Sequence, residues 1–187
     1  GASSARARAE RGRARGDRAR GSTAEAARAG IVRASEAARE VGLHLIVGSE
    51  LVIEDGPRLV LLAENRAGYA RLCSLITRAR RRSKKGAYRL VRDDPGQADN
   101  AGLLALWLPG DPIMPEHGVW LARHFPGRTW LAVELHRGPD DDARLRACQQ
   151  TAAAIGIPAV AALALQHNCR RRRPYAAESQ SRAAPVT

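Results

Sequence analysis

The chain is poor in cysteine and in aromatic residues. Its three cysteines, Cys73, Cys148 and Cys169, are far apart and form no CxxC pair, which argues against a disulfide framework and against a thiolate zinc site. Aromatic residues make up 4% of the chain and hydrophobic residues 44%, so the core must be mostly aliphatic. This cysteine usage is typical of a reducing compartment, and we predict a cytoplasmic protein.

Signals for membranes and for nucleotide-binding loops are also absent from the sequence. No apolar run approaches the roughly 20 residues that a helix needs to cross a bilayer, and the Arg-rich start has no apolar region of the kind found in secretory signals. Gly42, Gly48 and Gly56 lack the spacing of a P-loop or a dinucleotide-binding fingerprint, and Ser49 is not part of a Gly-x-Ser-x-Gly elbow. We therefore expect no membrane partner and predict no catalytic residue.

The two ends of the chain differ from the middle in composition. Residues 1–29 include no Leu, Ile, Val, Phe, Tyr or Trp, so no side-chain burial offsets their ordering entropy. They hold eight arginines and three acidic residues, and residues 164–187 hold five arginines and one acidic residue, so the ends carry nine of the twelve net positive charges. We divide the chain into segment 1–29, body 30–163 and tail 164–187. We expect both ends to be disordered, or translated out of frame, and to bind polyanions non-specifically.

Between these ends, apolar runs of strand length alternate with helical patterns. The expected strands are 43–47, 51–53, 58–62, 103–108, 130–135 and 158–163, and the expected helices are 31–41, 67–82, 115–125 and 139–155. We expect the first strand to end at residues 48–50, a hairpin at the Asp55-Gly56 pair, and a polar loop over 93–100. Strands separated by single helices predict parallel βα units, with a ligand site at the C-terminal strand ends.

Several phrases of the body form an ordered set. They are Val-Gly-Ser-Glu at 47–50, Asp-Gly-Pro-Arg-Leu-Val-Leu-Leu-Ala at 55–63, Arg-Ala-Gly-Tyr at 66–69, Leu-Cys-Ser-Leu-Ile-Thr at 72–77, Leu-Ala-Leu-Trp-Leu-Pro-Gly at 104–110 and Trp-Leu-Ala-Val-Glu-Leu-His-Arg-Gly at 130–138. In this order they closely resemble the polymerase and histidinol phosphatase (PHP) domain of bacterial error-prone DNA polymerases. The resemblance covers residues 30–162 and implies an α/β fold, here an incomplete PHP-type distorted (βα)7 barrel with disordered Arg-rich termini.

The resemblance also implies a divalent metal centre, with Zn, Mn or Mg, in intact family members. Glu50 and Glu134 match family glutamates at two strand ends, and His136 is a further candidate ligand, although a lone histidine there is more often structural. The family's opening His-x-His strand would precede this chain. One family aspartate falls on Ala24, and the last Asp and His ligands fall within residues 163–168, as Ala, Gln and Asn. Two isolated carboxylates give little metal affinity, so we expect no cofactor in this chain.

The resemblance, together with the missing metal ligands, suggests the hypothesis that the chain is an N-terminal PHP fragment of an error-prone polymerase. The resemblance implies that the parent carries out damage-tolerant, DNA-templated DNA synthesis and binds DNA, and we expect the fragment itself to be inactive. A basic nucleic-acid-binding module and a metal-dependent phosphoesterase are the two alternatives. Because a barrel without its first strands exposes a sheet edge, we also expect the isolated chain to aggregate or to need partner segments.

A basic run marks the end of the predicted helix 67–82. Its members are Arg78, Arg80, Arg81, Arg82, Lys84 and Lys85. Such a cluster can contact nucleic-acid phosphates in a sequence-independent and salt-sensitive way. A solvated helix end, where basic groups also favour the helix dipole, is the other interpretation, and the sequence does not decide between them.

Overall fold

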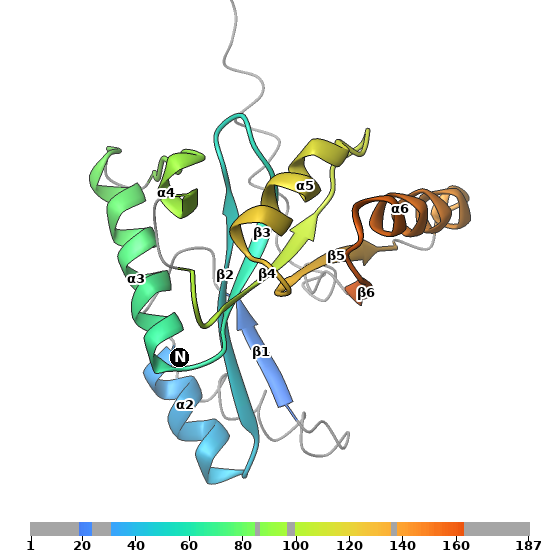
Figure 1. Cartoon of the computed structure of the whole chain (residues 1–187). Helices are drawn as coiled ribbons and strands as arrows, with labels where there is room; N and C mark the ends of the chain where they lie inside the picture. The colour runs from blue at the N-terminus through green and yellow to red at the C-terminus, as the bar shows by residue number, and fades with distance from the viewer. Residues whose placement is uncertain (1–18, 24–30, 85–86, 97–99, 136–137, 163–187) are drawn as a thin grey trace, which may run out of the picture.

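The computed structural model describes residues 19–23, 31–84, 87–96, 100–135 and 138–162. Within these residues, six strands form one sheet in chain order: β1 (Ala19–Thr23), β2 (His44–Val52), β3 (Arg58–Ala63), β4 (Leu103–Leu108), β5 (Thr129–Glu134) and β6 (Ala159–Ala162). The helices are α2 (Ile31–Glu40), α3 (Arg66–Arg81), α4 (Asp93–Gly96), α5 (Pro115–His124) and α6 (Asp141–Ile155). The predicted α/β class is confirmed (Figure 1), whereas α4 lies where the sequence predicted only a loop.

Strand β3 runs against the other five strands. β1–β2, β4–β5 and β5–β6 are parallel pairs, whereas β3 is antiparallel to both β2 and β4. The predicted hairpin is confirmed, with Asp55 at a φ of 52° in the turn. The prediction of a parallel unit between β3 and β4 is wrong, because the chain travels along the sheet twice between them. Helix α3 carries it one way, and the chain is back beside the end of β3 at Gly102, whose O accepts a hydrogen bond from the Glu64 N–H at 2.9 Å.

Strand β2 is one long strand, and the prediction that it ends at residues 48–50 is wrong. It continues to Val52, pairing with β1 along its first half and with β3 along its second half. The change of partner supplies new backbone hydrogen bonds where β1 stops, so the strand has no reason to end there. Glu50 therefore lies inside a strand, opposite Val60.

Strand β1 lies in the segment for which the sequence predicted disorder. Ala19–Thr23 pair in parallel with the first half of β2. A ladder of this kind uses backbone N–H and C=O groups, which Gly and Ser carry like any other residue, so the lack of apolar side chains did not prevent it. The structure thus describes these five residues as a strand. The rest of both predicted ends, 1–18, 24–29 and 164–187, lies outside the described residues, and disorder of the ends stays a prediction.

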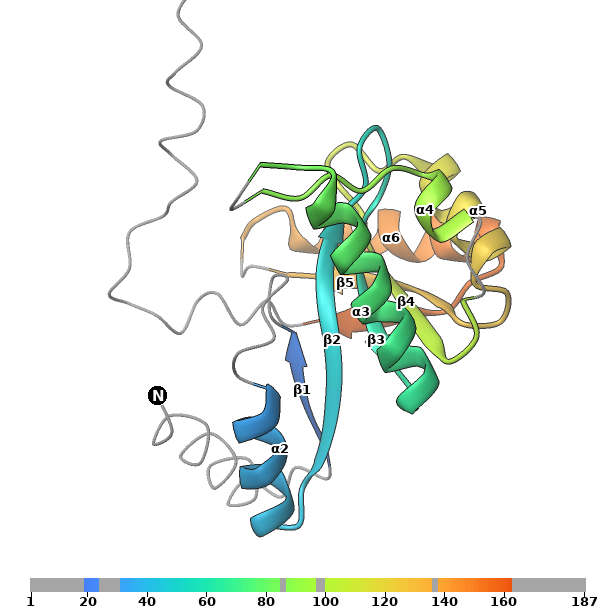
Figure 2. The same cartoon turned by 90° about the vertical axis from the view of Figure 1, so that its left-hand side faces the viewer.

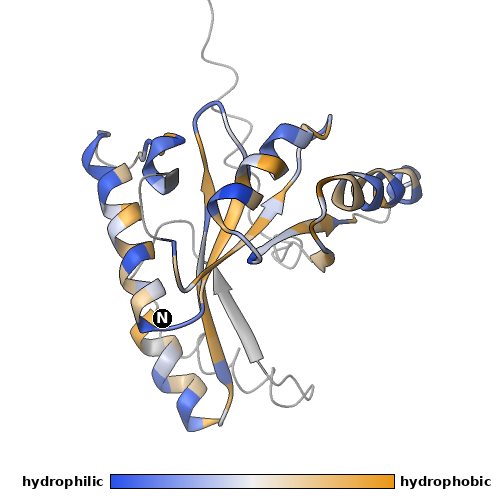
Figure 3. Cartoon of the chain, in the orientation of Figure 1, coloured by the Kyte–Doolittle hydropathy of each residue, from blue (hydrophilic) through white to orange (hydrophobic). Residues whose placement is uncertain are grey.

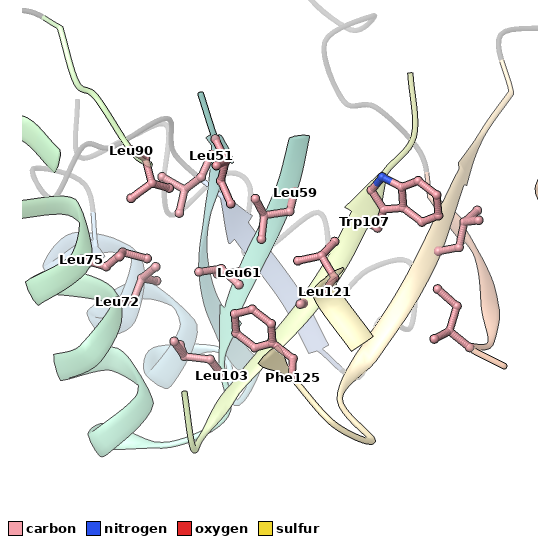
Figure 4. Packing of buried hydrophobic residues seen from close by; sticks show 14 of the residues in the cluster. Leu51, Leu59, Leu61, Leu72, Leu75, Leu90, Leu103, Trp107, Leu121 and Phe125 are labelled. Atoms are coloured by element: carbon pink, nitrogen blue, oxygen red, sulfur yellow. The ribbon is translucent and has the colours of Figure 1, made fainter. Parts of the chain in front are cut away.

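The helices and one face of the sheet enclose the hydrophobic core. Its members include Leu59 and Leu61 of β3, Leu103, Ala105 and Trp107 of β4, Leu72 and Leu75 of α3, Leu121 of α5 and Cys148 of α6. Figure 4 shows the side chains of α3 and α5 meeting the strands from this side. Figure 2 shows α3 lying along β2 and β3, and Figure 3 shows apolar residues following the strands. Burial raises the pKa of the Cys148 thiol, and both described cysteines are free.

The opposite face of the sheet is only half-buried, and we call it the open face. It is formed by Val60, Leu62, Leu104, Leu106 and Trp130. Within the described residues, β1 and β6 form the two edges of the sheet. Aggregation of the isolated chain through these apolar and edge surfaces stays a prediction. None of the described helices is long and apolar enough to span a membrane.

Candidate functional site

Glu50 and Glu134 both belong to the open face, near the end of the sheet at which β2, β4 and β5 finish. Glu50 lies opposite Val60 of β3, and Glu134 is the last residue of β5, four positions after Trp130 on the same face. Their side chains are 39% and 22% exposed. The structure therefore brings together the two carboxylates that the sequence singled out, although they come from strands separated by β3 and β4.

Arg58 lies between the two carboxylates. Its Nη2 donates to Glu134 Oε2 at 2.8 Å, and its Nε is 3.4 Å from Glu50 Oε1. Arg58 is the first residue of β3, and because β3 runs in reverse, its beginning lies at the end of the sheet where β2 and β4 finish, opposite Val52 and Leu108. The guanidinium thus neutralises carboxylates from two other strands.

The described members of the candidate set, Glu50 and Glu134, do not fit a resident divalent metal ion. Among the described residues, no three His, Cys, Asp or Glu side chains converge as a metal site requires, and catalytic zinc sites use three protein ligands. Glu50 and Glu134 lie near each other, and both form ion pairs with Arg58. His136, the third candidate ligand, lies outside the described residues.

Arg58 was not predicted from the sequence, although its place could be inferred in part. The Asp55-Gly56 hairpin implies that β3 is reversed, and a reversed strand brings its first residue beside the last residues of its neighbours. Glu50 and Arg58 are then close on adjacent strands. The contact with Glu134 has no such local signal, because it depends on the register of β3, β4 and β5 together.

The basic end of α3 is divided between structural and exposed arginines. Arg82 Nη1 lies 2.7 Å from both carboxylate oxygens of Asp94, and Arg78 Nη1 is 3.9 Å from Asp94 Oδ1. Asp94 is 2% exposed and also accepts a hydrogen bond from the Val91 N–H at 3.0 Å. Arg82 therefore anchors the segment after α3, a role that was not predicted from the sequence. Lys85 lies outside the described residues.

A groove runs along the same end of α3. It has a volume of about 460 Å³ and is lined by Cys73, Ser74, Thr77, Arg78, Arg81 and Arg82. The lining residues recur every three or four positions, so they share one side of the helix. Arg80 and Lys84, which the sequence placed in the same basic run, are exposed but do not line the groove.

Comparisons with known proteins identify relatives of the chain. The family model of the PHP domain matches residues 1–114. The error-prone DNA polymerase of Pseudomonas paraeruginosa strain PA7 is 56% identical over 146 residues, which are 77% of this chain and 14% of that protein. The error-prone DNA polymerase of Pseudomonas savastanoi pv. phaseolicola is 50% identical over 177 residues, 92% of this chain and 17% of that protein. The chain thus spans less than a fifth of the length of these relatives.

A solved structure shares the fold. It comes from Bifidobacterium adolescentis and is described as a metal-dependent phosphoesterase, with a TM-score of 0.57 and 14% sequence identity. The alignment covers 84% of this chain and 80% of the other chain. At this identity the likeness extends to the fold alone.

Proposed function

The chain belongs to the PHP domain family, and we propose that it is the PHP part of an error-prone DNA polymerase. The observation that carries the proposal is the 50% to 56% identity to proteins of that name over most of the chain. Because the chain covers 14% to 17% of those proteins, we assign DNA-templated DNA synthesis to a longer parent. That parent would bind DNA and act in damage-tolerant synthesis in the cytoplasm.

The chemistry of the described residues supports an inactive role for the chain by itself. Phosphoryl and nucleotidyl transfer use metal ions that bridge phosphate oxygens and are held by carboxylates. The two carboxylates that converge, Glu50 and Glu134, are bound to Arg58. A phosphoesterase activity has the same requirement for a metal ion with an open coordination position, so we do not propose it.

Primer extension tests this assignment. We expect the purified 187-residue chain to add no nucleotides to a primed template with Mg²⁺ and all four dNTPs. An antibody against the chain should capture, from cells of the source organism, a polypeptide several times longer that extends the same primer. Capture of a polypeptide no longer than the chain, or extension by the purified chain, would contradict the proposal.

We also propose that the groove on α3 contacts nucleic-acid phosphates. The specific observation is that Arg78 and Arg81 line it together with the hydroxyl groups of Ser74 and Thr77. Cationic and hydroxyl side chains are common phosphate partners. Arg82 is left out of this proposal because its guanidinium binds the buried carboxylate of Asp94.

The salt dependence of DNA binding checks the groove. Replacing Arg81 by Gln should weaken binding of a fluorescent single-stranded oligonucleotide and lower the slope of log K against log salt by about 1. Arg66→Gln is the matched control, since Arg66 is exposed at the opposite end of the same helix. An unchanged slope for Arg81→Gln, with binding lost on removal of residues 1–18 and 170–187, would place the binding in the Arg-rich ends instead.

A further inference from the structure

We propose that Arg58 is a built-in cation that occupies, with its guanidinium, the position a metal ion would need between Glu50 and Glu134. This inference is independent of the polymerase assignment, because it rests on the geometry of three side chains. It predicts a domain in which this end of the sheet is held together by an arginine, and in which divalent ions are excluded from these carboxylates.

The order and direction of the strands place Arg58 at this position. Strands β2, β4, β5 and β6 end at one side of the sheet with their last residues, but the reversed strand β3 arrives there with its first residue. Arg58 lies opposite Val52 of β2 and Leu108 of β4, and its side chain reaches over β4 to Glu134 of β5. A long side chain is needed for this span, since neighbouring strands are roughly 4.8 Å apart and β4 intervenes.

The chemistry of the guanidinium fits the two partners. Arginine presents several N–H donors in a planar fork and stays charged throughout the physiological pH range. Its Nε faces Glu50 at 3.4 Å while its Nη2 binds Glu134 at 2.8 Å, so one group serves both carboxylates. A lysine ammonium is a point charge without this fork. It would hold one carboxylate well and the other poorly.

The same arrangement opposes a divalent ion. A metal ion that bound both carboxylates would lie within a few ångströms of the guanidinium, and like charges at that distance repel strongly even when solvent screens them. Glu134 would also have to give up its hydrogen bond to Arg58, and Glu50 its ion pair with the same guanidinium. Removing the positive charge should therefore create affinity for a metal ion that the native chain does not have.

A titration with Mn²⁺, followed by electron paramagnetic resonance on the full chain, tests the proposal. We expect Arg58→Gln to bind Mn²⁺ at least about tenfold more tightly than the native chain, because a repelling charge is gone. Adding Glu134→Gln to that variant should abolish the gain. Arg58→Lys, which keeps the charge, should stay close to the native chain.

Arg89→Gln is the matched control. Arg89 Nε forms a 2.7 Å ion pair with Glu54, and both side chains are largely exposed. This variant removes one arginine charge and one Arg–Glu pair elsewhere, so it should leave Mn²⁺ binding unchanged. An equal gain in Mn²⁺ affinity in Arg89→Gln would show that the change in net charge alone causes the effect, and it would overturn the proposal.

A second test keeps Arg58 and therefore does not depend on the stability of Arg58→Gln. If Arg58 occupies the site, Glu134→Gln alone should leave the Mn²⁺ titration of the otherwise native chain as it was. Loss of a bound Mn²⁺ ion in Glu134→Gln would show that the carboxylates hold metal with Arg58 present, and the proposal would then be wrong.

Discussion

Replacement of Gly68 by alanine is expected to lower the free energy of unfolding by about 3 kcal/mol or more. Gly68 is buried within α3, where an added Cβ would lie 1.9 Å from the carbonyl oxygen of Gly102 and 2.6 Å from its carbonyl carbon. Both atoms belong to the backbone, so no side-chain rotation relieves the overlap. Gly102 is itself fixed, with a φ of +74° and its oxygen accepting the Glu64 N–H.

The sign of the change in unfolding free energy distinguishes close packing at Gly68 from helix propensity alone. In a solvent-exposed helix, a change from Gly to Ala stabilises by about 1 kcal/mol, the opposite of what we expect at Gly68. Ala70→Gly, at an exposed position of the same helix, is the control and should cost only about 1 kcal/mol. Urea unfolding followed by circular dichroism measures both variants. A Gly68→Ala variant as stable as the native chain would refute the close packing of α3 against the start of β4.

The second large effect is expected for Trp107→Ala, which should destabilise the chain by about 3–5 kcal/mol. Trp107 is 1% exposed and is among the largest fully buried side chains. It packs so tightly against α5 that a Cβ added at Gly118 would lie 2.5 Å from its ring. Truncation therefore removes a large apolar surface and leaves a cavity that rigid neighbours cannot fill.

Trp130→Ala is the control for this change. Trp130 lies on the adjacent strand β5 but on the half-buried open face, so it should lose only about 1–2 kcal/mol. Tryptophan fluorescence in the same urea titrations gives a second readout, since the loss of Trp107 removes the emission of a ring fully shielded from water. Equal destabilisation by the two variants would mean that the open face is as well packed as the core.

Local patterns in the sequence predicted most elements of the fold. The apolar run 103–108 matches β4, and the helical spacing of Leu72 and Ile76 matches α3. The predicted end of the helix 139–155 is also confirmed, because α6 ends at Ile155 and Gly156 caps it with a φ of 79°. These features depend on neighbours within a few residues, which is the range over which periodicity and capping act.

What the sequence did not predict depends on contacts between distant segments. The direction of β4 follows from its antiparallel pairing with β3, and the strand structure of residues 19–23 follows from their pairing with β2. The site shows the same limit: Glu50 and Glu134 were singled out by resemblance, but Arg58 joins them only through the combined register of three strands. Asp94 likewise gave no signal as the partner of Arg82.

The claim on which this account depends most is that Arg58, and not a metal ion, neutralises Glu50 and Glu134. Crystals of the chain grown with Mn²⁺, with diffraction data collected at the manganese absorption edge, measure this directly. We expect the Arg58 guanidinium between the two carboxylates, with no anomalous peak within bonding distance of either. A manganese peak bound by both glutamates, with Arg58 turned away, would contradict the account.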